Sequence, residues 1–173
     1  MLNIVLYEPE IPDNTGNIMR TCMAFNCRLH LIEPLGFYLD EYHLKRAGMD
    51  YIDEVEYYTY ANWEEFISKN KGDFFYITRY GKKTPDTFNF TECKNDIYLV
   101  FGKESTGIPK DILKANLDRC IRIPMVKEAR SINLSNSVAI ITYEVLRQFD
   151  YFDLSKVESI KGEDFLENYI IDE

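Results

Sequence analysis

Short apolar runs alternate along the chain with segments of helical periodicity. The runs have lengths typical of buried strands and lie at residues 2–7, 28–33, 52–59, 73–78, 96–101 and 119–124. The segments between and after them predict helices at about residues 14–25, 39–47, 62–70, 109–116 and 133–149. Because strands and helices alternate, the sequence predicts an α/β fold, a mostly parallel sheet with helices on both faces.

The last predicted helix follows a stretch rich in short polar side chains, Ser131, Asn133, Ser135, Asn136 and Ser137. Its apolar stripe then runs through Val138, Ile141, Val145 and Phe149. Ser and Asn in front of a helix commonly cap it. Together with the free N–H groups of the helix start, they can also hold a polar or anionic ligand. This stretch contains more such residues than a cap requires, and both functions are compatible with it.

Three loops follow strand ends, at residues 77–83, 101–109 and 123–131. Since ligands of open α/β folds bind at the carboxyl edge of the sheet, we expect these loops to meet there. Gly102 and Gly107 allow close approach of a ligand, although a simple turn would also explain them. Glu104 follows Gly102-Lys103, which excludes a P-loop, and no dinucleotide fingerprint follows the first strand. The residues alone therefore predict a polar site that is not an ordinary nucleotide site.

Length and composition predict one globular domain, residues 1–150, and an acidic tail, residues 151–173. The chain has 173 residues, of which 46% are hydrophobic and 28% charged. We expect the tail to form a peripheral helix at about residues 164–171 or to be partly disordered. No apolar stretch approaches 18 residues and no signal peptide is evident, so a cytoplasmic protein is expected.

The net charge of −9 argues against nucleic-acid binding at first sight, but it is concentrated at one end. Residues 150–173 contain eight acidic and two basic side chains. The remainder of the chain is nearly balanced and compatible with one basic face. The four cysteines, Cys22, Cys27, Cys93 and Cys120, form no metal-binding pattern, so buried free thiols and no metal are expected. His30 lies in an apolar run and is expected to be a strand residue rather than a catalyst.

Four segments occur in the order found in one enzyme family. They are Glu8-Pro9-x-Ile11-Pro12-x-Asn14-x-Gly16-Asn17-x-x-Arg20; Glu33-Pro34-Leu35-Gly36-Phe37 with Arg46-Ala47-Gly48-x-Asp50-Tyr51; Phe101-Gly102-x-Glu104-x-x-Gly107-x-Pro109; and residues 123–148. With these segments, which cover residues 1 to about 150, the chain resembles the SPOUT-class RNA 2′-O-methyltransferases. It is most similar to the TrmL-like branch of the SpoU family, which methylates the ribose of the tRNA wobble nucleotide.

The resemblance implies a C-terminal trefoil knot at about residues 75–150, an arrangement that pattern reasoning would not propose because threaded chains are nearly absent from proteins. It also implies a homodimer that uses S-adenosyl-L-methionine without metal and releases S-adenosyl-L-homocysteine. The cofactor would be held around Ile77, Gly102, Ile123 and Ser131. The substrate would be the anticodon stem-loop of tRNA, methylated at position 34 on cytidine or uridine.

Three residues are candidates for catalysis by the same resemblance. Arg20 matches an arginine that family members place beside the reacting hydroxyl. Because a guanidinium is a poor base, we expect it to stabilise the developing alkoxide or to orient a phosphate. Asn133 would line the transfer position, and Tyr143 would act near the substrate or at the dimer interface unless it is a core tyrosine. Glu104 is expected to pair with a backbone amide or with Arg130.

The remaining expectations concern RNA and the partner chain. Candidate contacts to the RNA backbone, considered only as a group, are Arg28, Lys45, Arg46, Arg79, Lys82 and Lys83. The apolar stripes of the first and last helices are wide enough to pack against both the core and a partner chain, which is consistent with a dimer. Because Arg20 is far from the cofactor loops in sequence, the site is expected to be shared between protomers. Two alternatives remain: methylation of another tRNA or rRNA position, and a non-catalytic RNA-binding protein on the same fold.

Overall fold

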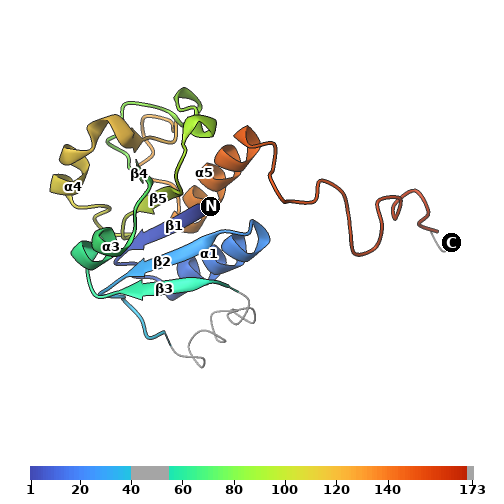
Figure 1. Cartoon of the computed structure of the whole chain (residues 1–173), viewed down its shortest axis with the longest axis horizontal. Coiled ribbons are helices and arrows are strands. Elements are labelled where there is room, and N and C mark those ends of the chain that lie inside the picture. The colour runs from blue at the N-terminus through green and yellow to red at the C-terminus, as the bar shows by residue number, and fades with distance from the viewer. Residues whose placement is uncertain (40–54, 171–173) are drawn as a thin grey trace.

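A computed structural model describes residues 1–39 and 55–170 of the chain. A six-stranded sheet with the order β3-β2-β1-β5-β4-β6 forms its centre (Figure 1). The strands are β1 (Leu2–Tyr7), β2 (Arg28–Ile32), β3 (Tyr57–Tyr60), β4 (Asp73–Ile77), β5 (Ile97–Phe101) and β6 (Cys120–Ile121). The helices are α1 (Pro12–Ala24), α3 (Trp63–Lys69), α4 (Lys110–Ala115) and α5 (Leu134–Gln148), with short 3-10 helices η2 (Pro85–Thr87), η3 (Phe90–Glu92) and η4 (Leu117–Arg119).

All neighbouring strands are parallel, which confirms the predicted sheet. Two hydrophobic cores lie on its opposite faces, because side chains alternate along each strand. On one face Ile4 and Leu6 of β1 pack with α1 and α5, and on the other face Val5 packs with Phe66 of α3 and Leu113 of α4. The helices therefore cover both faces, as Figure 1 shows.

Parallel pairing brings the carboxyl ends of the strands to one edge of the sheet. β1 lies between β2 and β5, with Leu6 level with Leu31 on one side and Phe101 on the other. β4 continues this edge, with Ile77 level with Phe101. The loops that leave β1, β4 and β5 therefore start side by side, which is the condition for one shared site.

Three boundaries differ from the prediction. Helix α1 begins at Pro12 rather than Asn14, since proline lacks only an N–H that the first helical turn would leave unpaired. Strand β6 is short because it pairs with β4 only near Tyr76 and Ile77. Phe149 follows the end of α5 and is 36% exposed, so its predicted place in the buried stripe is wrong, and Leu146 is buried instead.

Several predicted features lie outside the described residues. These are the helix predicted at residues 39–47, apart from its first residue, with Lys45 and Arg46, the turn at Gly48, the motif residues 46–51 and the first residues of the strand predicted at 52–59. Residues 151–170 contain turns without a helix and run away from the body (Figure 1). Tyr151 and Leu154, at the start of this segment, still pack against the core beside α5.

The cysteines and His30 have structural roles. Cys22, Cys27 and Cys120 are buried free thiols as expected, and Cys93 is half-buried. Burial raises the pKa of Cys27 to about 12, which keeps this thiol protonated and unreactive. His30 is a strand residue of β2 whose Nδ1 lies 2.9 Å from the Tyr60 hydroxyl and whose Nε2 lies 3.1 Å from Asn3 Oδ1. Burial, with the nearby Arg28 guanidinium, lowers the pKa of His30 to about 4.

No helix in the part of the chain that the structure describes is long and apolar enough to cross a membrane.

Candidate functional site

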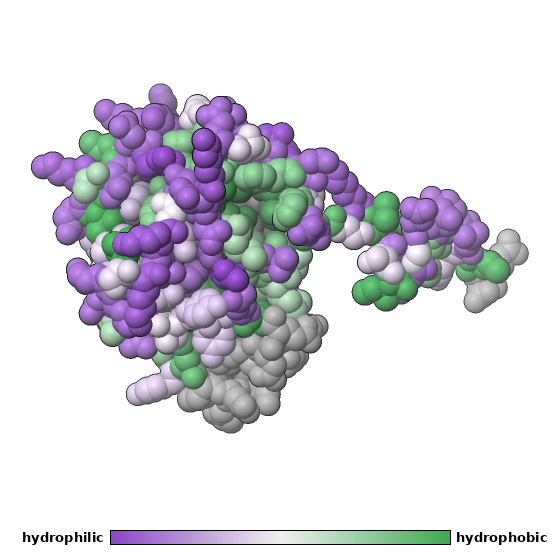
Figure 2. Space-filling view, in the orientation of Figure 1, coloured by the Kyte–Doolittle hydropathy of each residue, from purple (hydrophilic) through white to green (hydrophobic). Residues whose placement is uncertain are grey.

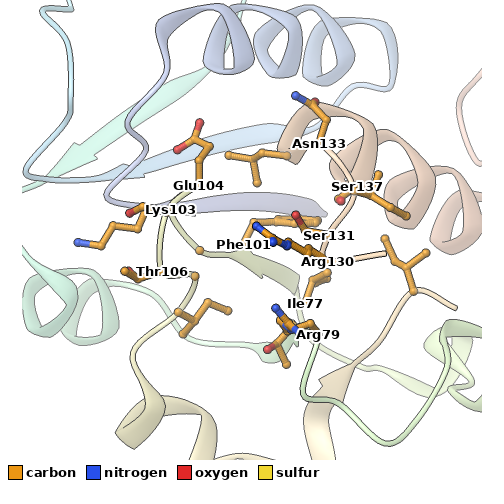
Figure 3. A pocket seen from close by; sticks show the side chains of 18 of the residues that line it. Ile77, Arg79, Phe101, Lys103, Glu104, Thr106, Arg130, Ser131, Asn133 and Ser137 are labelled. Carbon is orange, nitrogen blue, oxygen red and sulfur yellow. The ribbon is translucent and has the colours of Figure 1, made fainter. Parts of the chain in front are cut away.

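A cavity of about 510 Å³ opens at the carboxyl edge of the sheet. The three loops predicted to meet there line it, with residues 77–80, 101–108 and a third group between Ile123 and Ser137; Ile11 and Asn14 of the α1 start complete it. Figure 3 shows Lys103 and Glu104 on one side and Ser131, Asn133 and Ser137 on the other. The volume lies in the range of small-molecule sites, about 300–1,000 Å³.

Glu104 connects the second loop to the start of α1. Its carboxylate accepts hydrogen bonds from the backbone N–H of Glu10 at 2.8 Å and of Ile11 at 3.3 Å, and from Asn14 Nδ2 at 2.9 Å. Of the two expected pairings, the one with backbone amides is confirmed. A carboxylate at this position satisfies N–H groups next to a helix start and also complements the helix dipole.

Asn14 extends this connection to α5. It is 6% exposed, and its Oδ1 accepts a hydrogen bond of 3.0 Å from Asn133 Nδ2. Asn133 Oδ1 accepts from the N–H and hydroxyl of Ser135 at 2.9 and 2.7 Å and from the N–H of Asn136 at 3.3 Å. Asn133 is therefore the N-cap of α5, and the same side chain ties α5 to α1 beside the cavity.

Two further contacts hold the second cavity loop against the residues that precede α1. The Glu10 carboxylate accepts hydrogen bonds from the Ser105 hydroxyl at 2.7 Å and the Ser105 N–H at 2.8 Å, and these bonds lower the pKa of Glu10 below its usual value. Lys103 Nζ lies 2.5 Å from Glu8 Oε2. Residues 8–11 and 103–105 thus hold each other in place, so the loop has a defined shape.

Gly102 is required by a close approach of backbone. A Cβ at this position would lie 2.1 Å from both the Gly107 carbonyl carbon and the Ile108 nitrogen. Gly107 has a φ of +74°, in the left-handed region, and its N–H donates to the Lys103 carbonyl at 2.9 Å. The loop therefore folds back on itself, which explains why both glycines occur here.

The structure brings five of the seven predicted site residues together. Ile77, Gly102, Ile123, Ser131 and Asn133 all line the cavity. Arg20 and Tyr143 do not.

Arg20 lies on the exposed side of α1. Tyr143 is 50% exposed on α5 and its hydroxyl accepts a hydrogen bond of 2.9 Å from the Tyr151 hydroxyl. It is therefore not a core tyrosine, and both residues lie on surface that a second molecule can reach.

The sequence did not identify Asn14, Glu10 and Ser105 as parts of the site. The position of Asn14 in the first family-like motif is the sequence feature that could have identified it. No sequence feature indicates the pairing of Glu10 with Ser105, because these residues are far apart along the chain.

The chemistry of the cavity is that of binding and orientation. Its lining, as far as the described residues form it, contains no His or Cys, and Glu104, a carboxylate in this lining, already accepts three hydrogen bonds. Among residues 1–39 and 55–170 no group of three or more His, Cys, Asp or Glu side chains is placed to hold a metal ion. The site offers polar contacts and cations, which suit binding and orientation of a polar ligand.

Basic side chains form part of the cavity lining. Arg79, Lys110 and Arg130 belong to its lining. Arg28, one of the predicted RNA contacts, lies instead at the first residue of β2, at the other edge of the sheet, with its Nε 2.9 Å from Glu56 Oε1. Lys45 and Arg46 lie outside the described residues.

Comparison with known proteins extends these observations. The SpoU rRNA Methylase family matches residues 1–143. A Bacillus subtilis (strain 168) protein provisionally named tRNA (cytidine(34)-2′-O)-methyltransferase is 51% identical over 154 residues, 88% of this chain and 96% of that protein. The tRNA (cytidine(34)-2′-O)-methyltransferase of Saccharophagus degradans is 46% identical, over 87% of this chain and 97% of its own length.

A solved structure also resembles the fold. It is described by the words "Structural insights into the 2-OH methylation of C/U34 on tRNA", has a TM-score of 0.79 and 38% identity, and matches 87% of this chain and 97% of that chain.

Proposed function

The chain belongs to the SpoU rRNA methylase family, and from this we infer that it is an S-adenosylmethionine-dependent RNA 2′-O-methyltransferase that modifies the wobble nucleotide of tRNA, cytidine or uridine at position 34. The observation that carries this inference is the likeness over nearly the full length of relatives with that named activity. A cavity bounded by the family-like loops supports it. We place the reaction in the cytoplasm, where tRNA is available.

The residues at the cavity fit S-adenosylmethionine. The close approach at Gly102 leaves backbone groups next to the cavity, and Ile77 and Ile123 add apolar surface for an adenine ring. Ser131 adds a hydroxyl for the polar end of the cofactor. When bound, the cofactor supplies a methyl group on a positively charged sulfur, and no metal is needed. We propose that these four residues hold it, and that residues of about 75–150 form the family's knot around it.

The chain's own residues orient the acceptor hydroxyl. A ribose hydroxyl must lose its proton as it attacks, and a positive group beside it lowers the barrier by stabilising the developing alkoxide. We propose this role for Arg20, because a guanidinium keeps its charge throughout. Asn133 acts by fixing the α5 start beside the cavity, through its bonds to Asn14 and Ser135. Tyr143 contacts the substrate or the partner chain.

A homodimer would bring Arg20 of one protomer to the cavity of the other. Helix α5 exposes apolar side chains, with Ile140 at 43% and Tyr143 at 50%, and Phe149 follows at 36%. Apolar surface of this kind lies beside the point where the tail leaves the body (Figure 2). Contiguous exposed apolar side chains commonly mark an interface, so we propose that this face joins two copies of the chain.

Methyl transfer from labelled S-adenosylmethionine to tRNA tests the function directly. Nuclease digestion and mass spectrometry should locate the 2′-O-methyl group at position 34, and Arg20→Ala should abolish it. Arg28→Ala is the matched control, since this arginine lies at the other edge of the sheet. Transfer to ribosomal RNA alone would contradict the tRNA assignment, and absence of cofactor binding would favour a non-catalytic RNA-binding protein.

Mixed dimers test the shared site. Gly102→Ala should block the cofactor loop because its Cβ has no space, whereas Arg20→Ala leaves the loop intact. A mixture of the two inactive variants should recover activity if one protomer supplies Arg20 to the other. Exchange must be verified by mass, and verified mixed dimers without recovered activity would contradict a shared site.

A further inference from the structure

Tyr80 lies at the entrance of the cavity with a solvent-exposed ring. It lines the cavity and is 59% exposed. Two cations lie near the ring. Arg79 Cζ lies 5.6 Å and Lys110 Nζ 4.8 Å from its centroid, both within the range of cation–π attraction. An aromatic ring with two positive charges beside it therefore lines the entrance of the site.

The turn that carries Tyr80 is anchored on both sides. Gly81 is buried against β6, where a Cβ would lie 2.8 Å from the Ile121 carbonyl carbon. The Tyr80 N–H donates to the Thr78 hydroxyl at 3.3 Å, and the Arg122 guanidinium donates to the Arg79 carbonyl. The backbone beneath the ring is thus fixed before any ligand arrives, which reduces the entropy lost on binding.

Lys110 is also held in place. Its ammonium donates to the carbonyls of Thr106 and Ile108, each at 3.3 Å, and so reaches from the second cavity loop across to the Tyr80 ring in the first. Among the described residues no acidic side chain forms an ion pair with Arg79, Lys110 or Arg130. These charges remain available to an anion from outside, although the chain as a whole carries −9.

Two ligands with an aromatic base could stack on Tyr80, the cofactor and a nucleotide of the RNA. The positive charges of Arg79 and Lys110 favour the nucleotide. S-adenosylmethionine carries a net positive charge, because its sulfonium and ammonium groups outweigh its one carboxylate, so two further cations beside Tyr80 give it no net electrostatic advantage. A nucleotide in RNA combines a base with a phosphate on each side. Aromatic side chains that stack bases beside cations that bind phosphates are the usual means of holding single-stranded RNA.

We propose that Tyr80 is a stacking platform for an unpaired base of the RNA substrate, and that Arg79 and Lys110 bind the phosphates beside that base. The inference rests on the proposed function, because it takes RNA as the substrate. It adds a specific contact to that function. Stacking on the rim would hold the RNA while the target ribose reaches the cavity, and it would be tolerant of base identity because every base offers a flat face.

The decisive measurement is the affinity for a fluorescent anticodon stem-loop RNA, with S-adenosylhomocysteine present. Tyr80→Leu should weaken binding by about 5- to 150-fold, the range expected for loss of one base–aromatic stack. Tyr80→Phe should retain the affinity because the ring remains. Tyr169→Leu is the matched control, since Tyr169 is 63% exposed in the tail.

The salt dependence of RNA affinity distinguishes the contribution of base stacking from that of the phosphate contacts. Lys110→Gln should reduce the slope of log affinity against log salt by about 0.7, as expected for one lost phosphate contact on a single strand. Tyr80→Leu should leave this slope unchanged. Affinity for S-adenosylhomocysteine alone, measured by calorimetry, should be the same for Tyr80→Leu and the wild type.

Each other outcome overturns the inference. Weaker binding of S-adenosylhomocysteine by Tyr80→Leu, with unchanged RNA affinity, would assign the ring to the cofactor's adenine. Unchanged affinity for both ligands would make Tyr80 an ordinary surface residue, and a wild type that binds no RNA would refute both proposals. Methylation assays with the same proteins and RNA, but with S-adenosylmethionine in place of S-adenosylhomocysteine, distinguish the two proposals: RNA that binds through Tyr80 but is not methylated would refute the proposed function alone.

Discussion

Replacing Glu104 should destabilise the protein, because its carboxylate connects the second cavity loop to the start of α1. In Glu104→Ala, the buried Asn14 amide and the Glu10 N–H lose their acceptor, at 2.9 and 2.8 Å in the wild type. A hydrogen bond to a charged group contributes about 1.5–3 kcal/mol. Because the carboxylate is half-buried, the lower value applies to each bond, and the free energy of unfolding should fall by about 3 kcal/mol.

Glu104→Gln separates the bonds from the charge. Glutamine keeps one carbonyl oxygen, so it retains an acceptor for one of the two short bonds but loses the negative charge at the α1 start. The expected loss is about 1.5 kcal/mol, the contribution of one bond. Loss of the connection between the loop and α1 should also weaken S-adenosylhomocysteine binding in both variants, because Lys103 to Ile108 line the cavity.

Urea unfolding, monitored by circular dichroism at one fixed protein concentration, measures the stability. Calorimetry measures ligand affinity. Glu128→Ala is the control, since Glu128 is exposed in the third loop. A Glu104→Ala protein within about 0.5 kcal/mol of the wild type, the usual effect of a surface substitution, would refute the reasoning.

Three further predictions concern the core, the loop and the tail. Because burial keeps His30 neutral with a pKa of about 4, against 6.5 for an ordinary histidine, only the unfolded chain takes up a proton between these values. Stability should therefore be unaffected above pH 6.5 and fall by about 3 kcal/mol as the pH drops to 4, and unfolding of His30→Gln across this range should lack that contribution. Gly102→Ala should lose S-adenosylhomocysteine binding in calorimetry while Gly162→Ala, in the tail, retains it; equal affinities would show that the loop adapts. Truncation after Ser155 should leave the urea midpoint unchanged, whereas truncation after Asp150 should lower it by removing Tyr151 and Leu154 from the core; equal midpoints would contradict these contacts.

The strands β1, β2 and β5 could be predicted because they are buried on both faces. Such strands appear in the sequence as continuous apolar runs, and for this reason β1 and β2 were located almost to the residue. The 3-10 helix η3 gave no comparable signal, since three residues show no periodicity. Its Phe90 is nevertheless fully buried, and its N–H donates to Gln148 Oε1 at 2.9 Å.

The position of the site could be predicted from the sequence, but the hydrogen bonds between its side chains could not. Parallel strands bring their following loops to one edge, which is a property of the fold class. The bond between Glu104 and Asn14, by contrast, joins residues 90 positions apart and depends on how loop and helix finally pack. Asn133 illustrates the same limit: its type suggested either a cap or a ligand contact, and the structure shows the cap together with a bond to Asn14.

The central place of β1 also has a consequence for synthesis on the ribosome. β1 emerges first, yet one of its two neighbours is β5, with Leu2 opposite Ile97. Until that segment has been translated, one edge of β1 exposes unpaired N–H and carbonyl groups that can recruit another chain. The cavity draws on residues from Ile11 to Ser137, so it closes only after most of the chain has left the exit tunnel. A stalled ribosome would therefore release fragments that aggregate rather than a partly active enzyme.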